Sequence, residues 1–312
     1  MSMEDYPRTL AELEARFSTQ EGCLTYLSAL RWPDGYSCPR CGSARNWKVR
    51  ETFECAVCGY QTSVIAGTIF QDTHLPLPVW FRAVWWVITQ KNGASALGLK
   101  RILGISYKTA WTCLHKLRRA MVRPGREKLS GRVEVDESYI GGLEEEVRGR
   151  ETEKKALVIV AAEENGKGVG RIRMQVIPDA SADSLIDFIT ANVEQGSVIH
   201  TDGWTGYDAT NKNGYVHEVT VLRRSGKKAH ECLPRVHLVV SLLKRWLLGT
   251  HQGAVGVLHL DYYLDEFTFR FNRRKSMSRG KLFYRLIQQA VSVDPAPYSM
   301  ITKRLKPFTP LK

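Results

Sequence analysis

The stretch Val133–Gly142, which reads VEVDESYIGG, decides the fold of this chain of 312 residues. Val133 and Val135 alternate with Glu134, and a glycine pair ends the run, so the pattern predicts a short half-buried strand followed by a turn. Asp136 occupies a position where a buried strand usually carries Val or Ile. Because an unpaired buried carboxylate is costly, Asp136 must either form an ion pair at the strand end or bind a cation.

Two later stretches continue this chemistry. Val198–Tyr207, VIHTDGWTGY, predicts a second short apolar strand that ends in an acid, Asp202. Arg235–Trp246, RVHLVVSLLKRW, predicts an apolar helix in which His237 and Lys244 are seven residues apart and so share one face. Two acids at strand ends, then a metal-capable side chain on a helix and a basic residue two turns later, have the layout of a DDE nuclease site.

The reaction of such a nuclease explains this set of side chains. In-line phosphoryl transfer on DNA uses two divalent metal ions roughly 4 Å apart, which activate the attacking oxygen and stabilise the leaving oxygen. Mg²⁺ is held by a few carboxylates together with phosphate oxygens of the substrate. A nearby lysine can hold a phosphate as a point charge. The pattern therefore predicts metal-dependent chemistry on a phosphodiester.

Four motifs in this order carry a family resemblance: VDESYIGG, HTDGWTGY, VHLVVSLLKRWLLGTHQG and HLDYYLDEFTFRFNRR, with cysteine pairs upstream. The chain resembles the DDE-type bacterial insertion-sequence transposases that carry an N-terminal zinc ribbon, the ISXO2-like group, over essentially its whole length. The resemblance implies an RNase H-like catalytic domain. It also implies Asp136 as the first catalytic acid, Asp202 as the second, and Lys244 as the basic residue after the third position.

The third position departs from the wider superfamily, which has Glu where this chain has His237. Relatives with Asn or His there exist within the group, so we interpret His237 as variation in the ligand. Asp136, Asp202 and His237 are then the expected ligands of catalytic Mg²⁺ or Mn²⁺. A neutral imidazole offers one nitrogen to a cation that prefers oxygen, which favours tolerance of Mn²⁺.

The overall composition indicates a soluble protein with a polyanionic partner. The formal net charge is +13 with a pI near 9.5, and the mean hydropathy is −0.27. Such a positive excess favours nucleic acid binding. No apolar run approaches the ~18 residues of a membrane span, and the acidic start lacks the apolar region of a secretory signal. We expect a cytoplasmic, nucleoid-associated protein without a membrane partner.

Four of the seven cysteines form two CxxC pairs, each followed by a glycine that permits a tight turn. Four thiolates at this spacing suit structural Zn²⁺ with a closed coordination sphere, and an iron–sulfur centre is the alternative. A segment this small depends on the metal for much of its folding energy. The expected zinc ligands are Cys38, Cys41, Cys55 and Cys58. Cys113 lies on a helical pattern and is expected in the core.

The segment Ala94–Arg126 has eight Lys or Arg and no Asp or Glu. It predicts a helix, a turn at Gly104 and a second helix capped by Ser106, as in a helix-turn-helix whose second helix enters the major groove. A generic helical hairpin is the alternative. Two further basic stretches, 223–230 and 272–281, suit phosphate contacts. The predicted DNA-binding residues are Lys100, Arg101, Tyr107, Lys108, Trp111, Lys116, Arg118, Arg119, Arg223, Arg224, Arg273 and Arg274, and His115 is a further candidate for the groove-facing side.

The expected fold class is α/β with a mixed (α+β) sheet. The expected segments are N-terminal helices over 1–33, a zinc ribbon over 34–72, the helix-turn-helix region over 73–128, the RNase H-like catalytic domain over 129–293 and a tail over 294–312. In the catalytic domain we expect strands at 132–140, 155–162, 170–177, 197–201 and 217–221, with helices at 181–193 and 203–210. In that fold the first and fourth strands are adjacent, which would bring Asp136 and Asp202 together. An aromatic-rich helix at 80–87 is expected in the core, with a base-stacking platform as the alternative.

These features together predict a transposase. It would bind the terminal inverted repeats of its insertion sequence, nick double-stranded DNA at the element's ends and transfer the freed 3′-hydroxyl to target DNA. Since two ends must be held at once, a homodimer or higher assembly on DNA is expected. Two alternatives remain. The first is a DNA-binding relative that no longer cuts, which would explain why His237 replaces the usual Glu. The second is a zinc-ribbon regulator, which leaves Asp136 and Asp202 unexplained.

Overall fold

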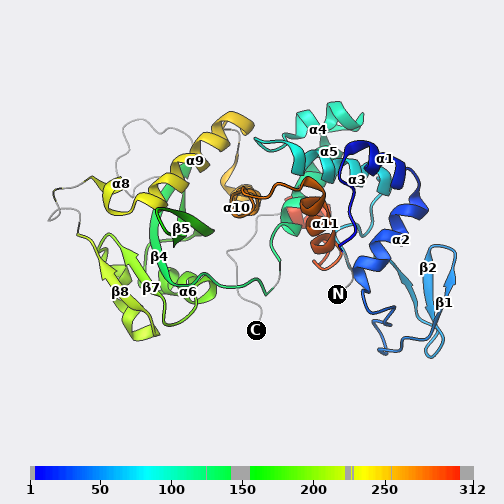
Figure 1. Ribbon diagram of the computed structural model, residues 1–312, viewed down its shortest axis with the longest axis horizontal. Helices are drawn as coiled ribbons and strands as arrows, with labels where there is room; N and C mark the ends of the chain where they lie inside the picture. The colour runs from blue at the N-terminus through cyan, green and yellow to red at the C-terminus, as the bar shows by residue number, and fades with distance from the viewer. Residues whose placement is uncertain are drawn as a thin grey trace. The chain divides into compact units, whose positions relative to one another are not determined.

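The computed structural model describes residues 4–123, 125–141, 155–221, 226, 228–253 and 255–302. The chain divides into two compact units (Figure 1). The first, here called the ribbon unit, contains the described residues up to 123 together with 276–302, and the second, the sheet unit, contains those from 125 to 275. No helix in the described part of the chain has the length and apolar character needed to cross a membrane.

The ribbon unit is helical apart from one small antiparallel sheet. Several of its helices begin at side-chain caps, such as Thr9 on the first and Thr19 on the second, because these hydroxyls accept free backbone N–H groups of the first turn. The sheet has the order β1-β2-β3 and forms the ribbon predicted around the cysteines. The elements are α1 (Leu10–Arg16), α2 (Gln20–Arg31), β1 (Asn46–Val49), β2 (Thr52–Cys55), β3 (Gln61–Ser63), α3 (Leu77–Thr89), α4 (Ala96–Leu103), α5 (Tyr107–Ala120), α11 (Arg279–Ala290) and α12 (Tyr298–Thr302).

The predicted helix-turn-helix pattern matches α4 and α5. Gly104 ends α4 in the left-handed region at φ 65°, where a glycine avoids the strain of a side chain. The hydroxyl of Ser106 then caps α5 by accepting the N–H of Thr109 at 3.0 Å. The aromatic helix α3 is buried, as expected for a core helix, with Trp80 3% exposed and Phe81 fully buried.

Helix α11 belongs to the ribbon unit, whereas the sequence placed it at the end of the catalytic domain. Its Phe283 is fully buried, and its ring lies 5.6 Å from the ring of Phe81 and 6.0 Å from that of Trp85 in α3. A side chain at Gly280 would clash with the backbone of Pro7. The helix therefore returns to the N-terminal part of the chain because its apolar face completes the core around α3.

The sheet unit contains a five-stranded mixed sheet with the order β6-β5-β4-β7-β8. The first three strands are antiparallel neighbours, and β4, β7 and β8 run parallel to one another. This is the order of an RNase H-like sheet and confirms the predicted fold class. The elements are β4 (Arg132–Gly141), β5 (Lys155–Asn165), β6 (Gly168–Ile177), α6 (Ala182–Asn192), β7 (Val198–Thr201), η1 (Thr205–Asn213), β8 (Val216–Val219), α8 (Ala229–Cys232), α9 (Pro234–His251), η2 (Val257–His259) and α10 (Leu260–Asn272).

Two apolar layers cover the two faces of this sheet. One joins α6 and η1 to alternate residues of the central strands, including Val133, Val135 and Ile159. The other joins α9 and α10 to the opposite set, including Val158 and Val160. In Figure 1, α9 and α6 lie on different sides of the strands. The segment predicted as a helix over 203–210 is a 3₁₀ helix, η1, over Thr205–Asn213.

Helix α10 protects β6, which is an edge strand. The side chain of Asp261 accepts the N–H of Val176, and Asn272 both accepts the N–H of Ile172 and donates to its carbonyl oxygen. Arg274 donates to the carbonyl oxygens of Val169, Gly170 and Phe271. These contacts satisfy backbone groups that an open sheet edge would expose. Arg274 was predicted to bind DNA, and the structure shows that it also stabilises this edge.

Candidate active site

Asp136 and Asp202 lie at the same level of two neighbouring parallel strands. Glu134 of β4 pairs with His200 of β7, so two further residues along each strand bring Asp136 level with Asp202. Asp202 follows the last residue of β7, and its Oδ1 accepts the N–H of Trp204 at 3.0 Å. The structure thus brings together the two acids that the sequence singled out.

His237 reaches the same place from α9. Its Nε2 lies 3.7 Å from Oδ2 of Asp136, with side-chain exposures of 32% and 19%. Lys244 follows two turns later on α9 and is exposed. His237 therefore lies beside Asp136, with Asp202 at the carboxyl end of the neighbouring strand β7 and Lys244 further along α9.

Burial and neighbouring acids destabilise the ionised form of Asp136. Burial raises its pKa most, the carboxylates of Glu137, Asp202 and Glu134 add to the rise, and the pKa reaches about 7. Like charges held this close favour a proton or a cation between them. Carboxylate oxygens are the ligands that Mg²⁺ and Mn²⁺ prefer, and a bound cation would offset the repulsion between these two acids. The residues therefore fit a divalent cation.

The environment of His237 favours its neutral form. Burial lowers its pKa, and electrostatic repulsion from His230 and Lys244 lowers it further against the opposing effect of Glu134 and Asp202. A neutral imidazole has a lone pair for a metal ion. Although the Lys244 residue is exposed as a whole, partial burial of its ammonium group lowers its pKa, and repulsion from Lys155 adds to this effect.

Two other acids of the VEVDE run are committed to protein contacts. Oε2 of Glu137 accepts the hydroxyl of Tyr207 at 2.7 Å, on the η1 face of the sheet. Glu134 is fully buried and pairs with Arg235 at 2.8 Å. The sequence predicted a half-buried strand here, but the strand is buried on both faces at Glu134 because the start of α9 covers that face.

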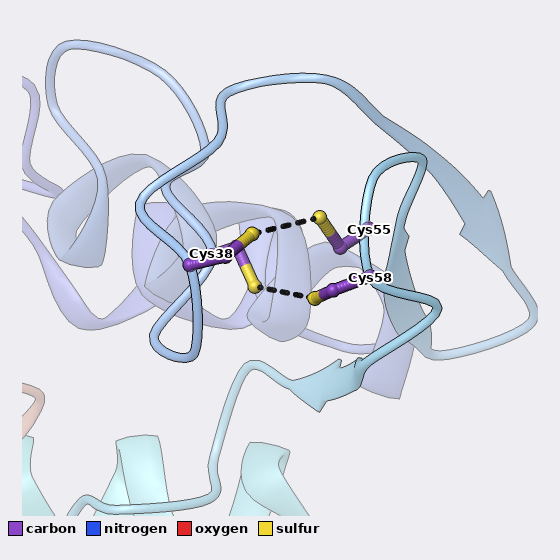
Figure 2. A group of neighbouring side chains, drawn as sticks. Cys38, Cys55 and Cys58 are labelled. Carbon is purple, nitrogen blue, oxygen red and sulfur yellow. Dashed lines mark hydrogen bonds between the residues drawn. The ribbon is translucent and has the colours of Figure 1, made fainter.

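The four cysteines of the two CxxC pairs form a compact group. Their sulfur atoms all lie within 4.8 Å of one another, and in the part of the chain that the structure describes this is the one such group of three or more potential ligands. The Sγ atoms of Cys38 and Cys58 are 3.6 Å apart, and those of Cys41 and Cys55 are 3.5 Å apart. Figure 2 shows Cys38, Cys55 and Cys58 pointing toward one another from the two turns of the ribbon.

This geometry fits Zn²⁺. A tetrahedral ion with Zn–S bonds of about 2.3 Å holds its sulfur atoms about 3.8 Å apart. Although burial opposes ionisation of Cys38, hydrogen bonds from the backbone N–H groups of Arg40 and Cys41 and from nearby thiols lower its pKa to about 6. A backbone hydrogen bond from Cys58 likewise lowers the pKa of Cys55. The first cysteine of each pair is thus prepared to bind as a thiolate.

The predicted DNA-binding residues of α4 and α5 separate into two groups. Lys100, Arg101, Tyr107 and Lys108 are exposed, and Trp111 and Arg119 are partly exposed. Lys116 is 8% exposed and donates to the carbonyl oxygen of Gln71 at 3.1 Å, and Arg118 is 2% exposed. His115 is fully buried against the ring of Trp111 at 4.1 Å. Burial contradicts the predicted groove contacts of Lys116, Arg118 and His115, because the second half of α5 forms part of the core.

The remaining predicted basic residues lie in the sheet unit. Arg223 and Arg224 are outside the described residues. The guanidinium of Arg273 lies 4.1 Å from the centre of the Phe269 ring, and that of Arg274 lies 4.0 Å from the Phe271 ring. Both arginines therefore pack on aromatic side chains of α10.

Comparison with known protein families matches both units. Residues 18–61 match the transposase zinc-ribbon domain, and residues 128–272 match the ISXO2-like transposase domain, a DDE domain. The chain carries an ISXO2-like transposase domain and a transposase zinc-ribbon domain. The zinc-ribbon match includes all four cysteines, and the DDE match includes Asp136, Asp202, His237 and Lys244.

The transposase also resembles individual proteins. A Halobacterium salinarum protein described as an uncharacterized protein in transposable element ISH50 is 28% identical over an alignment of length 280, and the alignment covers 81% of this chain and 91% of that protein. A chain in the crystal structure of the Mos1 Strand Transfer Complex aligns over 68% of this transposase and 75% of that chain, with 11% identity and a TM-score of 0.26. A TM-score this low does not establish a common fold.

Proposed function

We propose that this transposase binds the terminal inverted repeats of its own insertion sequence, nicks them and transfers the freed 3′-hydroxyl to target DNA. The observation that carries the proposal is the position of Asp136 in the middle of β4, where it is level with Asp202 just after β7 and 3.7 Å from His237 in the first turn of α9. The reaction would take place on double-stranded DNA in the cytoplasm, in association with the nucleoid. Because two ends must be held together, the working form would be a homodimer or a higher assembly.

Asp136, Asp202 and His237 would hold catalytic Mg²⁺ or Mn²⁺. When bound, the metal activates the attacking oxygen and stabilises the leaving oxygen at phosphorus. Asp136 would keep the site negative, and the neutral imidazole of His237 would present its Nε2 toward Asp136. Lys244, on the same face of α9, would hold a phosphate of the substrate as a point charge. Nicking and strand transfer would use one site, since each is an in-line displacement at phosphorus.

Substitutions at position 237 test whether this helix supplies the third ligand. His237→Ala should lower cleavage of element-end DNA by about a hundredfold or more, because one ligand of the metal is lost. His237→Glu should retain cleavage and raise the Mg²⁺ rate relative to the Mn²⁺ rate, since a carboxylate offers the oxygen that Mg²⁺ prefers. The measurement is the initial rate of nicking in each metal. Equal rates for wild type and both variants would exclude His237 as a ligand.

The ribbon unit would supply sequence recognition through the exposed start of the helix-turn-helix. The double substitution Lys100→Ala, Arg101→Ala should weaken binding to the terminal repeats and reduce the slope of log affinity against log salt by about 2, one for each phosphate that is no longer neutralised. Fluorescence anisotropy across a salt series measures this. The matched control, Lys167→Ala with Lys212→Ala, removes the same charge from exposed positions of the sheet unit. Equal effects of the two double substitutions would mean that net charge alone drives binding.

The alternative function is DNA binding without cleavage. It is favoured only by the imidazole at the position where the wider superfamily has Glu. A protein that binds the element's ends tightly but does not nick them in Mg²⁺ or Mn²⁺ would fit this alternative.

A further inference from the structure

Glu134 is a buried acid that the proposed reaction does not use. It lies two residues before Asp136 on the same face of β4, is fully buried, and faces the start of α9. A carboxylate without solvent is costly unless its oxygens are hydrogen-bonded. The hydrogen bonds between Glu134 and α9 all fall on the first turn of that helix.

The carboxylate binds the free amides of that turn. Oε2 of Glu134 accepts the N–H of Arg235 at 2.7 Å and the N–H of Val236 at 3.0 Å, and Oε1 accepts from the guanidinium of Arg235 at 2.8 Å. The first amides of a helix have no partner within it, and the helix dipole favours a negative charge there. The helix itself supplies no side-chain cap, since its N-cap is Leu233. Glu134 therefore replaces the missing cap from the neighbouring strand.

Arg235 extends the attachment to the turn between β5 and β6. Its guanidinium lies 2.9 Å from Glu164 and donates to the carbonyl oxygens of Gly166 and Gly168 at 2.9 Å and 3.2 Å. The start of α9 is thus tied to β4 through Glu134 and to the hairpin through Arg235. The next residue after Val236 is His237, whose Nε2 lies 3.7 Å from Asp136.

From this geometry we infer that Glu134 is a positioning residue that holds the first turn of α9 on β4 and so places His237 against Asp136. The inference rests on the proposed function, because His237 matters only if the site binds metal. Glu134 and Asp136 are spaced two apart on β4, and their partners on α9 follow in the same order. The contacts of Glu134 therefore fix the position of α9 along β4 at the point where His237 meets Asp136.

The test compares Glu134→Gln with Glu164→Gln in the full chain. Gln at 134 keeps one acceptor oxygen and the side-chain volume, but it loses the charge and turns an amide toward Arg235. Glu164→Gln removes the other carboxylate that pairs with Arg235, and it leaves the hydrogen bonds from the N–H groups of Arg235 and Val236 to Glu134 intact. Hydrogen exchange of peptides from the start of α9 measures how firmly Glu134 anchors that turn, and it does not depend on catalysis. The Mn²⁺ concentration for half-maximal nicking of element-end DNA measures the effect of this anchor on the metal site.

We expect Glu134→Gln to speed exchange at Arg235–His237 at least about tenfold and to raise the Mn²⁺ requirement at least about tenfold, with exchange in β5 unchanged. Glu164→Gln should have a much smaller effect on both. Unchanged exchange at the start of α9, or faster exchange throughout the sheet unit, would overturn the inference. If wild type does not nick DNA but the local exchange difference appears, the anchor stands and the proposed function fails.

Discussion

Asp136→Asn should abolish metal-dependent cleavage of the element's ends while making the sheet unit more stable above neutral pH. The loss of cleavage should be about three orders of magnitude or more, because the substitution removes a charged ligand shared by both chemical steps. The gain in stability follows from burial of a carboxylate beside Glu137 and Asp202, which raises its pKa to about 7. Asn removes that charge and keeps the shape of the side chain.

The pH dependence of the stability has a defined sign. The folded-state pKa of Asp136 lies above its ordinary value of 3.8, so the folded state holds the proton more tightly than the unfolded state does. Wild-type stability should therefore fall as pH rises from about 4 to about 7 and stay low above that. A rise from 3.8 to about 7 corresponds to a cost of up to about 4 kcal/mol for the ionised form.

Thermal unfolding without added Mg²⁺ or Mn²⁺ measures this cost. Asp136→Asn should melt above wild type at about pH 8, and the difference should vanish toward about pH 4. Adding Mn²⁺ at the higher pH should raise the melting temperature of wild type more than that of the variant, since bound metal offsets the repulsion. A variant that melts below wild type at about pH 8 would show that the acid is satisfied by protein contacts and not prepared for a cation.

Loss of a zinc ligand should unfold the ribbon and leave the RNase H-like sheet folded. Cys55→Ser should reduce the bound zinc from one per chain to a small fraction, because the four sulfur atoms form one closed tetrahedral set. Structural zinc contributes about 10–16 kcal/mol to the folding of small zinc-finger peptides, and the short strands β1–β3 cannot replace that. Elemental analysis measures the zinc content, and proteolysis should then cut first within 34–72.

The control for the zinc experiment is another buried cysteine of the same unit. Cys113 is 2% exposed on α5 and outside the cluster, so Cys113→Ala should keep one zinc per chain and a protected ribbon. Acidification should release the zinc from wild type, since the ligands must be thiolates. A Cys55→Ser protein with full zinc and a protected ribbon would contradict the assignment of the four ligands.

The sheet could be predicted from the sequence because its signals are local. Alternating apolar and polar residues predicted the strands, and the RNase H-like topology that the family resemblance implies places Asp136 beside Asp202. The cysteine spacing predicted the ribbon for the same reason. In both cases a short run of residues carries the geometry.

The features that the sequence interpretation missed depend on contacts between distant residues. Glu134 looks like a solvent-facing residue of a half-buried strand until α9, a hundred residues later, covers it. The sequence feature that could have indicated this burial is Arg235, a basic residue two positions before His237 that can pair with a buried acid. Lys116 and Arg118 look like part of a basic DNA-binding face, but that side of α5 packs into the core of the ribbon unit. α11 carries an amphipathic pattern that fits either unit, and contacts with distant residues, such as that of Phe283 with α3, decide between them.

The most direct test of the proposed active site is to map the cleavage of DNA that carries the element's own ends. Purified protein with Mg²⁺ or Mn²⁺ should leave a 3′-hydroxyl at the terminal nucleotide of the element, and this product should be absent with Asp136→Asn and with Asp202→Asn, although both variants still bind the DNA. Glu164→Gln, outside the proposed ligand set, should still produce it. If the two aspartate variants nick the ends as fast as wild type, the acid within β4 and the acid that follows β7 are not the catalytic site.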